Sequence, residues 1–204
     1  HGDDKGLKLP PKLAPHQIVI VPIIPNDKDK DSVMTVVNQL NDTLSEFRVI
    51  IDDRSEVSPG FKFNEWEQKG VPLRVEVGPK DIEKNTILVS RRDDESKNSY
   101  PMDDVQNTIK KLLDEIQDNL YKNSENTLKE NTTHVESFSE LIEVLNSKKG
   151  FVSCFWKENK EDELKIKEET SATLRCYPLE NTDSEKAVNS DSENGNFAIF
   201  SKAY

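Results

Sequence analysis

Apolar and polar positions follow two different periods along the first half of the chain. The nearly continuous apolar run QIVIVPII at 17–24 predicts a strand that is buried on both faces. From Val33 to Phe47 the apolar residues recur at helical spacing, which predicts an amphipathic helix capped by Ser32. The order of these and the following elements predicts an open, mostly parallel or mixed sheet with helices on its faces. The following elements are strands at 48–52, 71–78 and 85–90, a short helix at 59–69 ending at Gly70, and a helix with an apolar stripe from Val105 to Leu120.

The last third of the chain predicts a second, smaller unit. Residues 121–133 have few apolar side chains and are expected to continue the preceding helix as a solvated connector. Residues 180–195 are polar and are expected to form a disordered loop. The proline-rich segment 1–16 is expected to be an extended connector, so the predicted boundaries are 1–16, 17–120 and 121–204. The elements predicted in the second unit are helices at 137–147 and 161–170, with strands at 150–156, 172–179 and 196–204.

Composition adds that charge is unevenly distributed. The chain carries 39 acidic and 28 basic residues, a formal net charge of −11, which argues against a polycation for nucleic acid. Residues 61–97 contain eight bases and eight acids, so this region repels a polyanion least. Two cysteines, with no long apolar run and no charged-then-apolar leader, indicate a reducing compartment and no membrane contact. We therefore expect a cytoplasmic protein.

The residues themselves supply no enzymatic reaction. The seven glycines form no phosphate-binding loop, the three histidines lie in predicted connectors, and no serine lies in a nucleophile elbow. Cys154 and Cys176 fall on strands that are expected to be neighbours, but two thiolates cannot complete the four-ligand shell of zinc. We expect no catalytic residue and no metal site, and we interpret both cysteines as buried apolar side chains.

The stretch GFKFNEWEQKGVPLRVEVGPKD at 60–81 combines aromatic and charged residues at short spacing. An arginine can donate two hydrogen bonds to guanine O6 and N7, and a carboxylate can accept from guanine N1–H and N2–H in unpaired RNA. An aromatic ring offers a surface on which a base can stack. All three kinds of group are present at Phe63, Glu67, Arg74, Lys80 and Asp81.

Four segments of the chain, taken in order, carry a family resemblance. They are HGDDKGLKLPPKLAPHQIVIVPI, the stretch at 60–81, KIKEETSATLRCYPLE and the terminal FSKAY. Together they resemble the C-terminal part of prolyl-tRNA synthetase of the archaeal and eukaryotic-like type, over essentially the whole chain. The resemblance implies a homodimeric parent enzyme that activates proline with ATP and magnesium and esterifies it to proline tRNA. It also implies that the catalytic motifs precede His1 and that 1–16 connects that catalytic domain to an anticodon-binding domain.

The family resemblance also specifies a fold and a site. It implies an α/β fold class with a five-stranded mixed sheet and flanking helices, as in class II anticodon-binding domains, plus a small α+β C-terminal domain. Lys97 matches a further basic position across a one-residue gap. The positions implied to read the two guanines of the proline anticodon are Phe63, Glu67, Arg74, Lys80, Asp81 and Lys97.

The C-terminal domain departs from the family pattern. Many members bind a structural zinc there through four cysteines, but FWKENKEDEL stands where two of them are found, and the final hairpin has no cysteine pair. Only Cys176 keeps a matching place, so we expect no zinc and a domain held by its apolar core. The resemblance also implies that Tyr204 docks toward the catalytic domain.

Alternative interpretations stay open. On spacing alone, Glu65, Glu67 and Lys69 can be the solvated face of a short helix, and Arg74 with Glu76 a same-face pair on a strand. The leading hypothesis is RNA recognition in support of proline–tRNA ligation. The second is a docking or dimer-supporting module without direct tRNA contact, with the helix up to Leu120 and the terminal strand as its surfaces. The third, a standalone editing domain, lacks any nucleophile–base pair.

Overall fold

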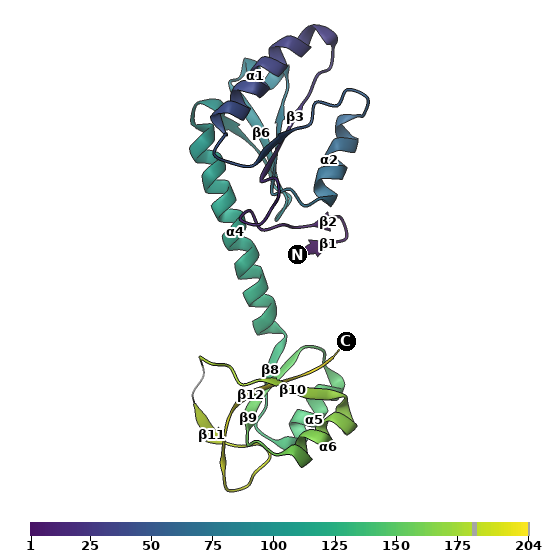
Figure 1. Cartoon of the computed structure of the whole chain (residues 1–204), viewed down its shortest axis with the longest axis vertical. Coiled ribbons are helices and arrows are strands. Elements are labelled where there is room, and N and C mark those ends of the chain that lie inside the picture. The colour runs from purple at the N-terminus through teal and green to yellow at the C-terminus, as the bar shows by residue number, and fades with distance from the viewer. Residues whose placement is uncertain (181–182, 204) are drawn as a thin grey trace. The chain divides into compact units, whose positions relative to one another are not determined.

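The computed structural model describes residues 1–180 and 183–203 and divides the chain into two compact units, His1–Asn123 and Ser124–Tyr204 (Figure 1). Each unit has its own five-stranded sheet and its own apolar core. Within the described ranges, we find no helix with the length and apolar character needed to cross a bilayer.

The sheet of unit 1 confirms the prediction of a five-stranded mixed sheet. Its strands are β3 (Ile18–Pro22), β4 (Val49–Ile51), β5 (Leu73–Val77), β6 (Thr86–Arg91) and β7 (Lys97–Pro101), in the order β4–β3–β5–β6–β7. Strand β3 is parallel to β4 and β5, whereas β6 is antiparallel to both of its neighbours. Parallel neighbours require crossover connections, and helices supply them here.

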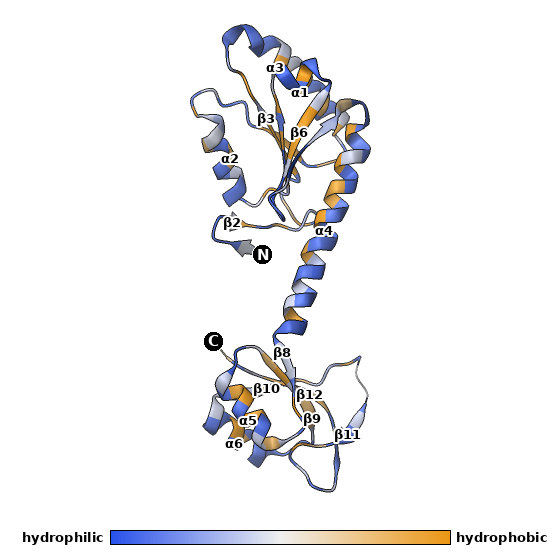
Figure 2. Cartoon of the chain, turned by 180° about the vertical axis from the view of Figure 1, so that it is seen from behind, coloured by the Kyte–Doolittle hydropathy of each residue, from blue (hydrophilic) through white to orange (hydrophobic). Residues whose placement is uncertain are grey.

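Helices pack on both faces of this sheet. On one face, α1 (Lys30–Thr43) and α4 (Val105–Glu130) contact the side chains of Ile18 and Ile20. On the other face, α2 (Pro59–Gln68) contacts Val19 and Val21 through Trp66. Successive side chains of a strand point to opposite faces of the sheet. Because helices cover both faces here, β3 is apolar throughout. Figure 2 shows this apolar colour on the central strands. The shorter helices are α3 (Pro79–Glu83) and the 3-10 turns Asp27–Asp29 and Met102–Asp104.

The ends of the first two helices correct one prediction and confirm another. Helix α1 begins at Lys30 with Asp29 at the cap position, so the predicted cap at Ser32 is wrong. Ser32 lies in the first turn, where its hydroxyl donates to the carbonyl oxygen of Asp29 at 2.9 Å. Helix α2 ends before Gly70, which has φ +72° and therefore takes the left-handed conformation expected of it.

Residues 1–16 are more structured than the expected extended connector. Strands β1 (Gly2–Asp3) and β2 (Gly6–Leu7) form an antiparallel hairpin. Farther along, the Arg48 side chain donates to the carbonyl oxygens of Pro11 and Ala14 at 2.8 and 2.9 Å. These hydrogen bonds attach the segment to unit 1.

Unit 2 packs two helices on one face of its sheet. The sheet order is β10–β12–β9–β8, with β11 also paired to β12, and only β8 and β9 are parallel. Helices α5 and α6 contact a core that includes Trp156 and Phe200. The elements are β8 (Thr132–His134), α5 (Phe138–Ser147), β9 (Phe151–Trp156), α6 (Lys160–Thr170), β10 (Ala172–Cys176), β11 (Ser184–Lys186) and β12 (Asn194–Lys202).

The expected disordered loop at 180–195 is wrong for its described part. Strand β11 pairs with β12, for example Ser184 with Asn196. Ala187 is buried, and the amide of Val188 donates to the carbonyl oxygen of Phe155 at 2.8 Å. Backbone hydrogen bonds to an existing strand order this segment, although its side chains are almost all polar.

Two other expectations for unit 2 concern its two cysteines and its last residue. Cys154 and Cys176 are not on neighbouring strands, because β12 lies between β9 and β10. Cys154 is buried, and burial raises the pKa of its thiol to about 12, whereas Cys176 is exposed. The interpretation as a buried apolar side chain therefore holds for Cys154 alone. Tyr204, the expected docking residue, lies outside the described residues.

Candidate nucleic-acid interface

A row of side chains crosses the sheet of unit 1 on the face that α2 covers. The register pairs Val19 with Arg74, Arg74 with Ser90, and Ser90 with Lys97, across β3, β5, β6 and β7. Directly paired residues on neighbouring strands share a face, so Arg74, Ser90 and Lys97 lie side by side. Helix α2 packs on the β3 end of this row through Trp66.

Arg74 is the centre of the row. Its guanidinium carbon lies 4.1 Å from the centre of the Phe63 ring, within the range of a cation–π contact. Its Nη2 donates to the Ser90 hydroxyl at 3.1 Å, and its Nε donates to Glu76 Oε1 at 3.2 Å. The Lys97 Nζ lies 2.9 Å from Glu76 Oε1 and 5.7 Å from the centre of the Phe63 ring. The structure thus brings Phe63, Arg74 and Lys97 together around one carboxylate.

That carboxylate, Glu76, is a residue that the sequence did not assign to the site. Its side chain is 7% exposed and lies between the cations of Arg74 and Lys97. A buried carboxylate is costly unless it is paired, so the two cations fix its position. The same-face strand pair of Arg74 and Glu76, raised above as an alternative, is therefore present. It forms part of this cluster.

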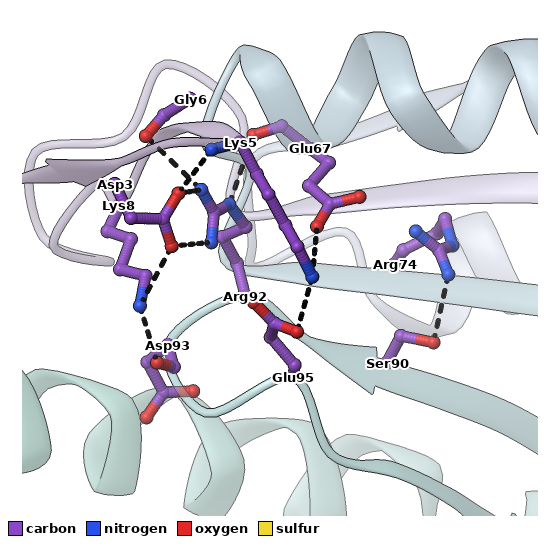
Figure 3. A network of polar contacts seen from close by, with 10 residues as sticks. All are labelled: Asp3, Lys5, Gly6, Lys8, Glu67, Arg74, Ser90, Arg92, Asp93 and Glu95. Carbon is purple, nitrogen blue, oxygen red and sulfur yellow. Dashed lines mark hydrogen bonds and ion pairs between the residues drawn. The ribbon is translucent and has the colours of Figure 1, made fainter.

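A cavity of about 190 Å³ opens beside the cluster. Glu67 from α2, Arg74 from β5 and Lys97 from β7 all line it. Figure 3 shows the Glu67 and Arg74 side chains near each other, with Arg74 joined to Ser90. The lining combines hydrogen-bond acceptors, cationic donors and apolar surface, and the apolar part comes from Val19, Trp66 and Val71. Such a lining suits a flat polar ring such as an unpaired base.

A buried carboxylate anchors helix α2. Asp52, which follows β4, accepts hydrogen bonds from Trp66 Nε1 and Arg54 Nε, both at 2.8 Å. The buried Lys62 donates to the Asp52 carbonyl oxygen at 3.0 Å. The hydrogen bonds from Arg54 and Trp66 outweigh the effect of burial and lower the pKa of Asp52 to about 2. These contacts fix the rotation of α2, and with it the candidate residues that α2 carries.

Lys80 and Asp81 lie apart from the cluster. Both belong to α3, which follows β5, and neither lines the cavity. Asp81 Oδ2 accepts a hydrogen bond from the Gly78 amide at 2.9 Å and so caps its own helix. Lys80 is exposed. The assignment of these two residues to base reading stays a prediction.

Sequence reasoning missed several residues of the cavity, and it also missed Glu76 in the adjoining cluster. Ser90 reaches it through the register of β6, and Arg92 and Glu95 reach it through the turn after β6. Glu76 could have been found from alternation, since it lies two residues after Arg74 on one strand. Ser90 required the strand pairing, and Arg92 and Glu95 required the position of the turn after β6. Strand β7 (Lys97–Pro101) was not predicted, because its sequence KNSYP has no apolar alternation.

The described residues, 1–180 and 183–203, contain no group of three or more His, Cys, Asp or Glu side chains arranged to hold a metal ion. The groups that the structure does bring together are the ions of Glu67, Arg74, Glu76 and Lys97, the Phe63 ring and the cavity.

Two family models match the chain. Residues 17–112 match the model described as "Anticodon binding domain", and residues 138–204 match "Prolyl-tRNA synthetase, C-terminal". The chain is 43% identical to a proline–tRNA ligase of Roseiflexus sp. (strain RS-1), in an alignment that covers 100% of this chain and 43% of the relative. It is 44% identical to a proline–tRNA ligase of Natranaerobius thermophilus, in an alignment that covers 88% of this chain and 37% of the relative. It is 42% identical to proline–tRNA ligase 2 of Clostridioides difficile, in an alignment that covers 100% of this chain and 42% of the relative.

The chain spans about two fifths of the length of these curated relatives. The anticodon-binding match covers the sheet of unit 1, α1, α2, α3 and the first turns of α4, and the second match covers most of unit 2. The chain is thus similar along its whole length to the C-terminal part of proline–tRNA ligases, with an anticodon-binding domain followed by the C-terminal domain of that family.

Proposed function

We propose that this chain is the tRNA-recognition part of a proline–tRNA ligase and that unit 1 reads the guanines of the proline anticodon. One observation carries the proposal. Glu67, Arg74 and Lys97 line one cavity beside the Phe63 ring, within the residues that match an anticodon-binding domain.

Each group has a distinct role in this proposal. Arg74 donates two hydrogen bonds to guanine O6 and N7, and Glu67 accepts from guanine N1–H and N2–H. The Phe63 ring holds the Arg74 guanidinium in place. The part of the ring that Arg74 leaves uncovered offers a surface on which a base can stack. Lys97 offsets the charge of Glu76 and of the nearby phosphates. Because Ser90 and Glu76 also hold Arg74, its guanidinium loses little freedom when RNA binds.

The family resemblance extends the proposal to Lys80 and Asp81. Lys80 is exposed on α3 and can contact a phosphate or a base. Asp81 already caps α3 through one oxygen, so its role in RNA binding would use the remaining acceptor sites of that carboxylate.

The proposal for the parent enzyme rests on the relatives and on the resemblance. It is a homodimeric cytoplasmic ligase of the archaeal and eukaryotic-like type, in which a separate catalytic domain uses ATP and magnesium to join proline to its tRNA. Tyr204 docks toward that domain. Unit 2 holds no zinc and depends on its apolar core. The comparisons give no support to the alternative of a docking module without tRNA contact.

Binding of an RNA stem-loop that carries the proline anticodon tests the proposal. Arg74→Ala is expected to weaken binding by about 1–3 kcal/mol, because a bidentate contact to guanine is lost. Arg74→Lys keeps the charge but not the planar fork, so most of the loss is expected to remain. Titration by fluorescence anisotropy at one fixed salt concentration measures both variants. Equal affinities for the wild type and Arg74→Ala would contradict the proposal.

A further inference from the structure

One guanidinium, that of Arg92, joins the N-terminal hairpin β1–β2 to three parts of unit 1 at the candidate site. Arg92 is buried, and its Nη1 and Nη2 donate to the two carboxylate oxygens of Asp3 at 3.0 and 2.6 Å. Its Nη2 also donates to the carbonyl oxygen of Gly6 at 3.2 Å, and its Nε donates to that of Glu67 at 3.1 Å. Arg92 therefore joins the hairpin, the turn after β6 and the last turn of α2 (Figure 3).

Two glycines allow the hairpin to approach α2 this closely. A Cβ on Gly6, where φ is +134°, would lie 2.4 Å from the Cα of Gln68. A Cβ on Gly70 would lie 2.6 Å from the Cβ of Leu7. Both distances are shorter than nonbonded carbon atoms tolerate, so larger residues would push the hairpin away from the helix. The approach is thus fixed by backbone shape as well as by charge.

The hairpin also brings a cation to the rim of the cavity. Lys5 Nζ lies 2.5 Å from Glu95 Oε2 and 3.9 Å from Glu67 Oε1, and both carboxylates belong to residues that line the cavity. In Figure 3 the Lys5 side chain extends from the hairpin to a position between them. Without Lys5, the hairpin would place no cation between the carboxylates of Glu67 and Glu95. These two negative charges would then repel each other and the incoming RNA.

We infer that the hairpin is a specificity-determining part of the pocket: Lys5 holds the carboxylate of Glu67 in position to read a guanine, and Arg92 is the positioning residue that keeps the hairpin in place. This inference rests on the proposed function. A carboxylate that is already oriented loses less conformational entropy when it meets its base. The carbonyl oxygen of Glu67 accepts a hydrogen bond from Arg92, and its carboxylate lies at ion-pair distance from Lys5, so one network contacts both.

The test compares two RNA stem-loops, one with the anticodon guanines and one with adenines in their place. The measured quantity is the ratio of the two dissociation constants. Lys5→Ala and Gly6→Ala are each expected to lower this ratio about fivefold, a part of the discrimination that one base-reading pair supplies. Gly6→Ala displaces the hairpin without changing any charge. Lys5→Arg keeps the cation and is expected to keep the ratio.

Lys12→Ala is the matched control. Lys12 lies in the same N-terminal segment and does not line the cavity. Loss of this charge is expected to weaken both RNAs equally and to leave the ratio at the wild-type value. If Lys5→Ala behaves in the same way, the hairpin contributes only charge and the inference is overturned, while the proposed function stands. If the wild type shows no preference for guanine, both are overturned.

Discussion

In each unit, a pair of core helices covers one face of the sheet, and aromatic rings lie on the opposite face. The neighbours of these rings differ between the two units. In unit 1, opposite α1 and α4, the Phe63 ring is next to Arg74 and Lys97, which share the carboxylate of Glu76. In unit 2, opposite α5 and α6, Phe155 pairs with Phe197 across β9 and β12, and their ring centres lie 5.6 Å apart. The surroundings of the ring, more than the ring itself, distinguish the candidate site from a packing surface.

This difference indicates that the two units depend on different interactions for their stability. The polar face of unit 1 is organised by paired ions around a cavity, and its stability draws on buried charges as well as on its core. In the described part of unit 2, by contrast, no charged side chain is buried. Its buried interior is almost entirely apolar and includes Trp156 and Phe200. Three substitutions test this contrast.

The largest effect is expected from Trp156→Ala. Trp156 is fully buried and contacts the rings of Phe138 and Phe200. Its removal is expected to lower the unfolding free energy of unit 2 by about 3–5 kcal/mol. The chain has two tryptophans, one in each unit, so Trp66 fluorescence in this variant reports on unit 1. Urea denaturation is expected to show an unchanged Trp66 transition. A parallel loss in both units would contradict independent cores.

The pH dependence of unit 1 is the next largest effect. The pKa of Asp52 is lowered in the folded state from 3.8 to about 2. A lowered pKa stabilises the folded state above the unfolded-state value, and this stabilisation is lost as the pH falls from about 4 to about 2. For Asp52 it amounts to about 2 kcal/mol.

Asp52→Asn is expected to flatten this pH dependence. The asparagine keeps an acceptor for Trp66 Nε1 but cannot change its charge. Urea denaturation between pH 2 and pH 6, followed by Trp66 fluorescence in a Trp156→Phe background, measures the difference. Parallel stability curves for the two proteins would show that Asp52 is not the group responsible.

The smallest of the three effects is expected from Glu76→Gln. The substitution keeps the size of the side chain but removes the charge shared by Arg74 and Lys97. We expect the unfolding free energy of unit 1 to fall by about 1.5 kcal/mol, the range of a hydrogen bond to a charged group. Glu83→Gln is the control, because Glu83 is exposed on α3 and its effect is expected within about 0.5 kcal/mol. Equal effects of the two substitutions would contradict a paired, buried role for Glu76.

The sequence predicted those parts of the fold whose signal is local. The apolar run of β3 and the helical spacing in α1 and α4 follow from burial, and Gly70 follows from backbone conformation. Strands β7, β8 and β11 were missed because their residues are mostly polar and they lie at the edges of their sheets; β8 begins within the predicted connector 121–133. Their backbone hydrogen bonds to a neighbouring strand are not visible in a sequence pattern.

The candidate site was predictable where the residues are close in sequence and not where pairing brings them together. Phe63, Glu67 and Arg74 lie within one short stretch and meet at one cavity and its adjoining ring. The contact of Arg92 with Asp3 joins residues 89 positions apart. It exists only because the hairpin packs on α2. Likewise, Cys154 and Cys176 were expected on adjacent strands because the later insertion of β12 between them has no local signal.

The most direct measurement of the central claim uses the wild-type chain and the two stem-loops with guanines or adenines in the anticodon. If unit 1 reads the guanines, replacing both is expected to weaken binding by at least tenfold at constant salt, since each mismatched base typically costs about 1–3 kcal/mol. Equal affinities for the two stem-loops would contradict the claim, and would leave the cluster at Phe63, Arg74 and Glu76 as a purely structural part of the sheet.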